Sequence, residues 1–482
     1  MDHSKTPLFS AVKAHIDRNV IPFHVPGHKH GVGAEELRAF TGNTIFQMDL
    51  NAMEDIDDIC NPISSIKESH ELIADAFGAD HAFMLTNGTT AGIHAMMLTA
   101  AHPGDKIILP RNAHKSTISA LILSGVIPVY THAEFHPELG ISTCVSTDAL
   151  KQAFEKEPHA VASFSINPSY YGFTPNLKEI VELSHQYEAL ALVDEAHGCH
   201  FKFHPEFPIS AMDAGADMSA CSTHKTCGSF TQSSILLMKE ARVEFESVKQ
   251  VLNLQRSTSG SYLLMTSIDT ARKQLMLHGN KLLDDTLELA RYAREKINNI
   301  DGLYAFGKEL ISSCKEVYHF DETKLTVNVR DIGLTGYEVE TLLREKYQIQ
   351  IELADLSNIM AIITLGDTQE HIDALVSALQ SIALHHSKPA LKHDVFLPEM
   401  PDVIVIPRDA FYAQKKSVSL SSSVGEIAGE SVMAYPPGIP IICPGERITQ
   451  EIVNYIQSLK KQNCSLQGTA DPYIDTIRVL GH

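Results

Sequence analysis

Three short polar segments contain residues whose types and order could do chemistry. The first is Thr86–Thr90 (TNGTT), where Gly88 permits a tight turn between a predicted strand and a predicted helix. The amides at the start of that helix, together with the hydroxyls of Thr89 and Thr90, could hold a phosphate group, and the helix dipole would help. Taken alone, the segment also fits an ordinary strand–turn–helix joint capped by a threonine.

The second segment is Leu192–Gly198 (LVDEAHG), in which Asp194 ends an apolar strand. α/β proteins bind ligands at the carboxyl ends of such strands. A buried carboxylate needs a cation or hydrogen-bond donors, and a protonated pyridine nitrogen would be such a cation. Holding that nitrogen protonated would make the ring an electron sink. The alternative is an aspartate that caps the next turn.

The third segment is Ser222–Gly228 (STHKTCG), with Lys225 in a polar cluster at a predicted strand end. A lysine amine in that position is suited to form a Schiff base with a carbonyl compound. A lone His-Lys pair would more often be part of an exposed loop. The order of the segments favours the Schiff-base lysine over the exposed loop. A phosphate-type turn, a strand-end aspartate and a Ser-x-His-Lys motif follow one another along the chain.

This order resembles the fold-type I pyridoxal-phosphate enzymes, which share the aspartate-aminotransferase architecture and carry the aspartate and the lysine on neighbouring strand ends. Further segments narrow the resemblance to the ornithine, lysine and arginine decarboxylases, and within them to the short bacterial arginine decarboxylases. Together the matches cover nearly the whole chain. They are Pro22–Lys29 (PFHVPGHK), Arg111–Ser116 (RNAHKS), Thr258–Leu264 (TSGSYLL), Tyr435–Pro440 (YPPGIP) and Pro444–Glu446 (PGE).

The resemblance implies a role for each matched residue of a pyridoxal 5'-phosphate site. Lys225 would carry the cofactor as a Schiff base, and either His224 or Lys225 would return a proton to the substrate carbon. The residues around the ring would be Asp194 at its nitrogen, His114 stacked on one face, Ala196 beneath the other face and His197 close by. The residues around the phosphate would be Gly88, Thr89, Thr90, Ser222 and His224.

Two features bear on how far the resemblance extends. Longer members of the family carry an extra N-terminal domain; this chain begins directly with the matched arm, so we expect that domain to be absent. Gly260 stands where many members have another residue, often proline, which leaves open the backbone of its loop and the contact of that loop with the site.

The pattern of apolar residues predicts the elements that position these segments. We expect an irregular N-terminal arm at 1–65, an α/β large domain with a mainly parallel sheet at 66–310, a smaller α+β domain at 311–390 and a C-terminal domain at 391–482, after a polar linker at His385–His393. Strands are expected at 82–86, 106–109, 128–131, 161–165, 190–193, 234–238, 324–330, 349–353 and 360–364, and helices at 66–77, 90–101, 177–188 and 337–346.

The charge balance and the cysteines limit the class of protein. Asp and Glu total 59 against 39 Lys and Arg, and the net charge of −20 argues against nucleic-acid binding. No apolar run approaches the roughly 20 residues that span a bilayer, so no membrane partner is expected. The eight cysteines form no CxxC pair, and Met1–Ser10 does not read as a secretory signal, which predicts reduced thiols in a cytoplasmic protein.

The predicted activity is the decarboxylation of a basic L-amino acid, arginine first, giving agmatine and carbon dioxide for polyamine biosynthesis. Lysine or ornithine as the substrate remains open, as does another fold-type I activity such as aminotransfer. The cationic tail of the substrate would need carboxylate partners, although most acidic residues are expected to be solvated surface charges. The candidates are Glu54, Asp55, Asp57, Asp58, Asp409, Glu426, Glu430 and Glu446.

A different class, a metal-binding protein, is prompted by the 25 histidines. The candidate ligand sets are His24, His28 and His30, or His197, His200 and His204. No metal is expected, because no acidic or cysteine partner completes either set and His200, Lys202 and His204 alternate as one face of a predicted strand. Since the arm has little to stabilise it alone, the family resemblance implies that it crosses onto a second subunit in a homodimer or higher homo-oligomer with composite sites.

Overall fold

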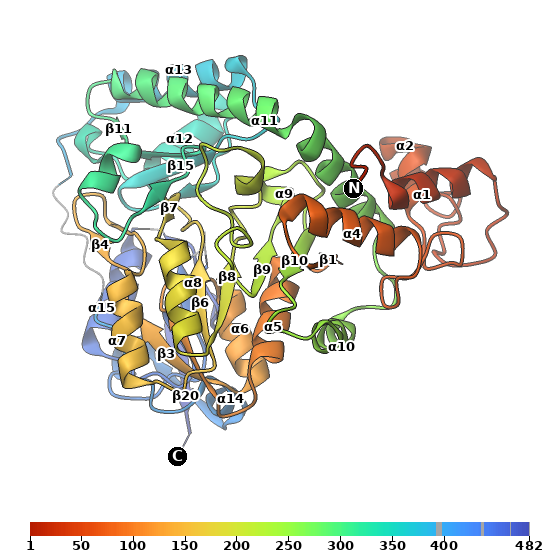
Figure 1. The fold of residues 1–482 in the computed structure, drawn as a ribbon. Helices are drawn as coiled ribbons and strands as arrows, with labels where there is room; N and C mark the ends of the chain where they lie inside the picture. Colours follow the sequence, from red (N-terminus) through yellow and green to blue (C-terminus); the bar gives the residue numbers. More distant parts are fainter. Residues whose placement is uncertain (392–397, 435–437, 463, 482) are drawn as a thin grey trace. The chain divides into compact units, whose positions relative to one another are not determined.

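The structure is a computed structural model that describes residues 1–391, 398–434, 438–462 and 464–481 (Figure 1). The chain forms two compact units, each built from two stretches of sequence. Residues 392 and 393 of the predicted linker and residues 435–437 of the matched segment Tyr435–Pro440 lie outside the described residues. The first unit comprises Met1–Thr99 and Leu192–Leu283, and the second comprises Ala100–Ala191 and Asp284–His482.

The first unit contains hydrogen-bonded strands in the order β1 (His81–Leu85), β10 (Ser234–Met238), β9 (Met218–Cys221) and the last three residues of β8 (Leu190–Asp194). β8 and β9 are parallel, whereas β10 is antiparallel to both of its neighbours. Nearly every residue in these strands is buried, which explains their continuous apolar sequences. The register of β8 and β9 sets Asp194 beside Ala220, so the strand-end aspartate lies one residue from the end of β9.

Helices in the first unit follow the apolar periodicity that predicted them. In α4 (Ser65–Phe77), buried Ile66, Ile73 and Phe77 line one face, and the helix ends at Gly78, whose φ of 71° favours glycine. The other helices are α5 (Gly88–Ala100), α9 (Thr223–Thr226), α10 (Phe245–Gln255) and α11 (Tyr262–Asn298), which continues into the second unit, with a 3₁₀ turn at Phe201–Phe203.

The N-terminal arm is more regular than predicted. It contains α1 (Pro7–Asp17), α2 (Glu35–Thr41) and α3 (Asn43–Met48). The amides of Leu8 and Phe9, at the start of α1, donate to Asp269 Oδ2 at 3.1 and 3.2 Å. Arg272, which pairs with Asp269, donates to backbone carbonyls before α1. These side chains belong to α11, so the residues that stabilise the start of α1 lie some 260 positions away in the sequence. Local periodicity could not reveal them.

The second unit contains a parallel set of strands in the order β6 (Ala162–Ile166), β2 (Lys106–Pro110) and β3 (Ile127–Thr131). Helices α6 (Lys115–Ser124), α7 (Thr147–Lys156) and α8 (Leu177–Gln186) alternate with them. Short strands complete this stretch: β4 (Phe135–His136), β5 (Ile141–Ser142) and β7 (Phe173–Thr174), the last paired with β12 (His319–Phe320).

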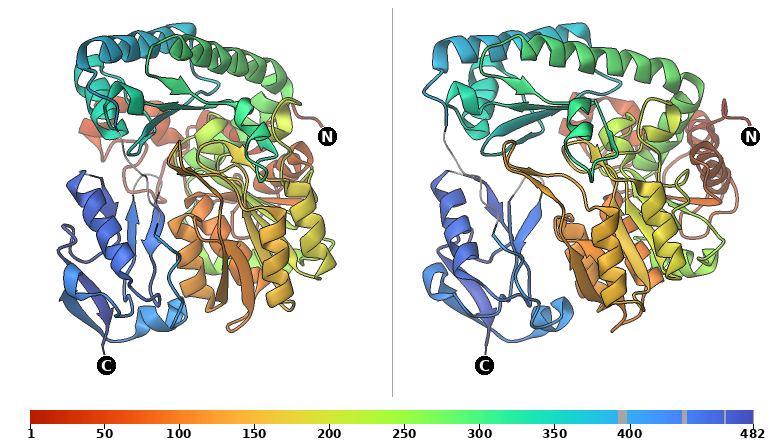
Figure 2. Two further views of the ribbon diagram at one scale, coloured as in Figure 1. Left: turned by 90° about the vertical axis from the view of Figure 1, so that its left-hand side faces the viewer. Right: turned by 60° about the vertical axis from the view of Figure 1, so that its left-hand side comes forward.

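A four-stranded antiparallel sheet follows in the second unit, in the order β11 (Tyr304–Ala305), β13 (Lys324–Asn328), β15 (Asn358–Ile362) and β14 (Leu353–Ala354). The end of α11 and α13 (Gln369–His386) lie side by side over it (Figure 2), and α12 (Gly336–Tyr347) begins in a capping box between Thr335 and Glu338. Apolar residues from these elements form one core. Two 3₁₀ turns, Lys308–Ser312 and Arg330–Ile332, connect elements of this part of the chain.

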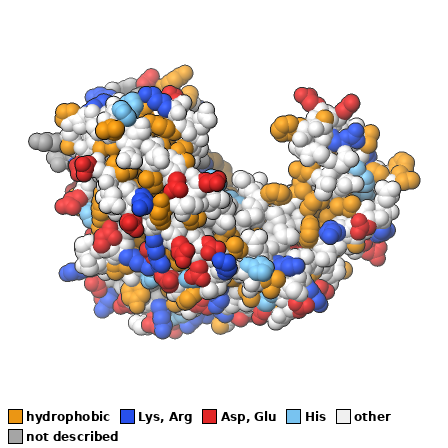
Figure 3. Space-filling model, turned by 90° about the horizontal axis from the view of Figure 1, so that it is seen from above, with side chains coloured by type: hydrophobic (Ala, Val, Ile, Leu, Met, Phe, Trp, Pro, Cys, Tyr) orange, Lys and Arg blue, Asp and Glu red, His pale blue; other side chains and the backbone are white. Residues whose placement is uncertain are grey.

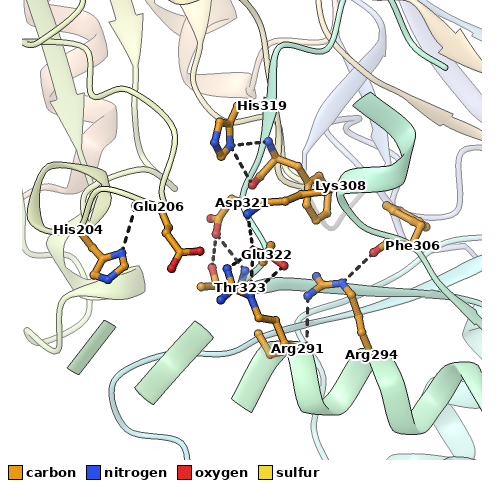
Figure 4. A network of polar contacts seen from close by, with 12 residues as sticks. His204, Glu206, Arg291, Arg294, Phe306, Lys308, His319, Asp321, Glu322 and Thr323 are labelled. Carbon is orange, nitrogen blue, oxygen red and sulfur yellow. Dashed lines mark hydrogen bonds and ion pairs between the residues drawn. The ribbon is translucent and has the colours of Figure 1, made fainter. Parts of the chain in front are cut away.

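Charged residues at the edge of this sheet pair with one another (Figure 4). Glu322 receives hydrogen bonds from Arg291 and forms an ion pair with Lys308 at 2.7 Å. Arg294 donates to the carbonyl of Phe306 at 2.9 Å. The network joins α11, the 3₁₀ turn and the segment before β13, so its charges stabilise the fold of this sheet.

The C-terminal segment has its own small core, formed by α15 (Gln450–Lys461) and two small sheets. One sheet pairs β16 (Lys415–Ser419) with β20 (Thr476–Leu480). The other has the order β18 (Ile439–Ile442), β17 (Val432–Ala434) and β19 (Leu466–Gln467). Helix α14 (Pro407–Tyr412) and a 3₁₀ turn at Leu420–Ser422 complete the segment. The boundaries of the four predicted domains remain predictions.

Two local predictions were wrong. The strand expected at 349–353 is reduced to Leu353–Ala354, and its partner lies at Asn358–Ile362 rather than 360–364. Residues 200–204 are not a strand: His200 and His204 flank a 3₁₀ turn and pack edge-on against Phe207. Aromatic packing buries these histidines, which explains an alternation that resembles a strand face. Within the described ranges, no helix is long and apolar enough to cross a bilayer.

Candidate active site

The end of β8 carries a buried carboxylate. Asp194 is 8% exposed, and its Oδ1 accepts a hydrogen bond from the Ala196 amide at 3.1 Å. Burial raises the pKa of Asp194, while the Ala196 amide and the positive charge of Lys225 act in the opposite direction. The carboxylate is therefore held in a place where a further cation would lower its free energy.

The end of β9 leads into the predicted Ser-x-His-Lys motif. Ser222 follows the strand, and Lys225 lies in α9, a single helical turn. The Lys225 Nζ is 2.9 Å from His197 Nε2, so the amine and the imidazole share a hydrogen bond. His197 follows β8 by three residues and is buried. Because β8 and β9 are parallel neighbours, the two strand ends bring Asp194, His197 and Lys225 to one edge of the sheet.

Two of the hydroxyls predicted to surround a phosphate, those of Thr89 and Ser222, meet in the same unit, and Ser234 joins them. Thr89 Oγ1 lies 2.5 Å from Ser222 Oγ, and it donates to Ser234 Oγ at 3.0 Å. All three side chains are buried. Ser222 follows β9, Ser234 begins β10 and Thr89 is in the first turn of α5, so three elements contribute one hydroxyl each.

The turn before α5 has the conformation that its glycine predicted. Gly88 has a φ of 69°, and its amide donates to the Gln232 carbonyl at 2.9 Å. A Cβ atom at Gly88 would meet nothing within 4 Å, so there is open space beside the turn. The first-turn amides of α5, including that of Thr90, form the positive end of the helix dipole.

His224 is oriented by a backbone carbonyl. Its Nδ1 lies 2.7 Å from the Ser233 oxygen, and a carbonyl can only accept, so Nδ1 carries the proton. In the neutral ring, Nε2 is then the basic nitrogen. Thr223 Oγ1 donates to the same Ser233 carbonyl at 3.0 Å. The β9–α9–β10 connection therefore fixes the ring of His224.

His114, the predicted ring-stacking residue, lies in the second unit. It caps the N-terminus of α6, where its Nδ1 accepts from the Ser116 amide at 3.2 Å. The Ser116 hydroxyl is 2.9 Å from the same nitrogen. Its stacking on a cofactor ring, like the roles assigned to Ala196 and the other matched residues, remains a prediction.

Sequence reasoning missed Ser234 and Gln232. Ser234 completes the hydroxyl cluster, and Gln232 has a φ of 80°, a left-handed conformation that glycine usually adopts. Their side of the site comes from β10, which lies between β1 and β9 although it follows both in sequence. The hydroxyl-rich run from Ser229 to Ser234 was the available signal.

Six of the eight carboxylates proposed for the substrate tail have partners within their own unit, among them Asp58, which accepts the Cys60 amide at 2.8 Å. In the first unit, Asp55 binds His15 at 2.9 Å, and buried Asp57 accepts several backbone amides around the start of α4. In the second, the carboxylates bind an arginine, a lysine or backbone amides: these are Glu446 with Arg111, Glu426 with Lys416, and Glu430 with the amides of Ala470 and Arg478. These contacts hold the folded chain together, so they give these carboxylates a structural role.

The loop of Gly260 packs tightly against the arm. A Cβ atom built at Gly260 would lie 2.9 Å from Ile59 Cγ2, closer than real contacts allow. Tyr262, two residues later, donates from its hydroxyl to the Asp57 carbonyl at 2.5 Å. A glycine at position 260 therefore leaves the space that the Ile59 side chain of the arm occupies.

Gly92 allows α5 to approach the sheet. A Cβ at this position would lie 2.8 Å from Ala220 Cβ and 3.0 Å from Leu85 Cδ1. Gly92→Ala should push the start of α5 outward, weaken cofactor binding about tenfold and lower the free energy of unfolding by roughly 1–3 kcal/mol. Cofactor titration and thermal unfolding would measure both effects. Gly366→Ala is the control, because its Cβ would meet nothing within 4 Å; equal affinity of Gly92→Ala and wild type would contradict the prediction.

The residues present fit pyridoxal 5'-phosphate. Its aldehyde requires an amine, its ring nitrogen a carboxylate and its phosphate a set of hydroxyl and amide donors. Lys225, the buried Asp194 and the hydroxyl cluster at the start of α5 supply these groups within one unit. Across the described residues, no group of three or more His, Cys, Asp or Glu side chains could hold a metal ion.

Comparisons with known proteins show the family to which the chain belongs. A family model described as Orn/Lys/Arg decarboxylase, major domain, matches residues 6–371, and the corresponding C-terminal domain model matches residues 390–471. The arginine decarboxylase of Bacillus subtilis is 45% identical over 484 positions, covering 100% of this chain and 99% of that protein. That of Halalkalibacterium halodurans is 45% identical over 480 positions, covering 99% and 98%.

A solved structure confirms the predicted fold class. The lysine decarboxylase of Francisella novicida superposes with a TM-score of 0.85 at 21% identity, over 98% of this chain and 81% of that chain. At that identity the likeness shows the fold alone. The two family models together match most of the sequence, and the relatives match from end to end. The chain therefore belongs to the Orn/Lys/Arg decarboxylase family.

Proposed function

We propose that this protein decarboxylates L-arginine to agmatine and carbon dioxide with pyridoxal 5'-phosphate held on Lys225. The single observation that carries the proposal is the meeting of the Lys225 amine, the buried Asp194 carboxylate and the Thr89 hydroxyl cluster within one unit. The choice of arginine over lysine or ornithine rests on the 45% identity to proteins named arginine decarboxylase. Membership of a decarboxylase family favours this reaction over aminotransfer.

The cofactor, when bound, supplies a ring that accepts the electron pair left by the departing carboxylate. Asp194 would keep the ring nitrogen protonated, because a buried carboxylate stabilises an adjacent cation. Thr89, Ser222 and the first-turn amides of α5 would hold the phosphate and so fix the ring.

The reaction consumes a proton, which must be delivered to the substrate carbon. The Lys225 amine, or the His224 Nε2 when that ring is protonated on both nitrogens, would make this transfer. Lys225 shares a hydrogen bond with His197, and His224 is oriented by the Ser233 carbonyl. These hydrogen bonds would fix the position of the Lys225 nitrogen or of the His224 ring, and so of the proton that it carries.

The active form is proposed to be a homodimer or a higher homo-oligomer. Support comes from the arm, whose large apolar side chains are exposed, with Phe23 94% and Phe40 90% accessible. Hydrophobic side chains lie among charged ones on the right of the face in Figure 3, the side on which Figure 1 has α1 and α2. Such a surface would be buried against a second copy. An active, monodisperse monomer in solution would contradict the proposal.

A cytoplasmic location and a role in polyamine biosynthesis complete the proposal. All eight cysteines are free thiols, which agrees with a reducing compartment. Agmatine, the expected product, is a polyamine precursor. Growth of a strain that lacks the gene, with and without added agmatine, would test the biosynthetic role.

Product identification tests the substrate. Purified protein, loaded with the cofactor, would be incubated separately with arginine, lysine and ornithine. We expect carbon dioxide and agmatine from arginine in equal amounts, at a kcat/KM at least about tenfold above that for the other two amino acids. Preference for lysine or ornithine would overturn the substrate assignment, and a keto acid in place of carbon dioxide would overturn the reaction.

A further inference from the structure

The C-terminal segment binds the loop that leads to His114. Arg111, the first residue after β2, forms a bidentate ion pair with Glu446: Nε to Oε1 at 3.0 Å and a terminal nitrogen to Oε2 at 2.8 Å. The guanidinium also donates to the carbonyls of Pro440 at 2.8 Å and Ile441 at 3.3 Å. Glu446 is 1% exposed and receives the Cys443 amide at 2.7 Å. This is a fully connected buried ion pair, which is a stiff link between two parts of a chain.

The same segment binds both ends of α6. At its start, the Lys115 amide, adjacent to His114, donates to the Gly438 carbonyl at 3.1 Å. At its end, Arg408 of α14 donates to the Ile122 carbonyl at 3.0 Å and to the Leu123 carbonyl. Helix ends leave such amides and carbonyls without partners inside the helix, so these contacts satisfy them. Helix α6 is therefore fixed in place by the C-terminal segment.

His114 depends on the start of that helix for its orientation. Its Nδ1 accepts the Ser116 amide, so a shift of the first turn would move the ring. Two residues, Asn112 and Ala113, lie between Arg111 and His114, and Ala113 is 1% exposed, which leaves little freedom in the link. Cys443 and Tyr130 also face the ion pair, and the arginine carbon lies 5.4 Å from the Tyr130 ring centre.

We infer that Arg111 and Glu446 are positioning residues, through which the C-terminal segment holds His114 in place at the start of α6. The inference rests on the proposed function and on the role that the family resemblance implies for His114, and it goes beyond them by giving the C-terminal segment a part in the reaction. A purely structural ion pair would lower stability when broken, but it would not act through His114.

A double-mutant cycle separates these two roles. Arg111→Met in the holoenzyme should lower kcat for arginine about tenfold, with KM changed less than about twofold. In a His114→Ala background the same change should lower kcat by less than about twofold, because the residue it positions is already absent. Glu446→Gln, which retains the shape of the side chain, should give the same pattern if Arg111→Met folds poorly. Equal losses in both backgrounds would overturn the inference.

Arg408→Met is the matched control, because it removes the contacts at the far end of α6. It should leave the visible circular dichroism band of the bound cofactor unchanged, whereas Arg111→Met should weaken it. Hydrogen exchange in cofactor-free protein provides a readout without activity: Arg111→Met should speed exchange in a peptide covering residues 113–118, and Arg408→Met should not. Equal spectra and exchange for the two variants would also overturn the inference.

The outcomes distinguish this inference from the proposed function. If wild-type holoenzyme releases no carbon dioxide from arginine, lysine or ornithine, the proposed function fails. The exchange experiment would still report whether Arg111 fixes the start of α6. If wild type is active and the cycle is additive, the proposed function stands and the positioning role fails.

Discussion

Lys225→Ala should lower kcat with arginine by at least about a thousandfold and remove the visible absorbance band of the bound cofactor. The amine is the group on this site that can bond covalently to an aldehyde, and it lies 2.9 Å from His197 within the strand-end cluster. Loss of both properties together is the expected result, because one nitrogen would hold the cofactor and take part in the proton transfer. Absorbance spectra and carbon dioxide release from the same preparation would measure them.

The control for this change is a lysine of the same unit away from the site. Lys239 donates to the Gly78 carbonyl and pairs with Asp80 at the surface. Lys239→Ala should retain the absorbance band and lower kcat less than about twofold, because a surface ion pair contributes little. A band that persists in Lys225→Ala at wild-type intensity would show that another amine holds the cofactor.

Asp194→Asn should lower kcat by about a hundredfold or more while the protein remains folded. An amide has nearly the shape of the carboxylate, so packing at the end of β8 should be retained. The charge is lost, and with it the stabilisation of a protonated ring nitrogen. Burial raises the pKa of Asp194, and an adjacent cation would act in the opposite direction and favour the ionised carboxylate.

The neighbouring Glu195 offers a control for burial alone. It is 2% exposed and accepts the Ala211 amide at 2.8 Å and the Ser219 hydroxyl at 3.2 Å. Glu195→Gln should lower the thermal midpoint and leave the cofactor spectrum unchanged, whereas Asp194→Asn should change the spectrum with a small effect on the midpoint. The reverse pattern would contradict the role proposed for Asp194.

The sequence predicted the central strands well because their apolar runs are uninterrupted and their ends carry polar motifs. Strands ending at Leu85 and Asp194, and the glycine turn at Gly88, lie where the motifs implied. The order of the strands within the sheet was harder to predict than the presence of each strand. The sequence does not state that β10 is inserted between β1 and β9, and this order is what adds Ser234 to the hydroxyl cluster.

Long-range contacts account for most of what could not be predicted. Helix α1 is capped by Asp269, and Arg111 is bound by Glu446, a residue that sequence reasoning proposed as a substrate ligand. In both cases a carboxylate accepts hydrogen bonds from residues far away in the sequence. Neither the spacing nor the periodicity of residues can therefore predict the contact. The substrate carboxylates could not be chosen for the same reason: most acidic candidates have structural partners that only the fold reveals.

The most direct test of the account is to locate the covalently bound cofactor. Holoprotein would be reduced with borohydride, digested and analysed by mass spectrometry for lysines that carry a phosphopyridoxyl group. The modification should be found on Lys225, and it should be absent when borohydride is omitted. Modification of a different lysine, with Lys225 recovered unmodified, would contradict the central claim.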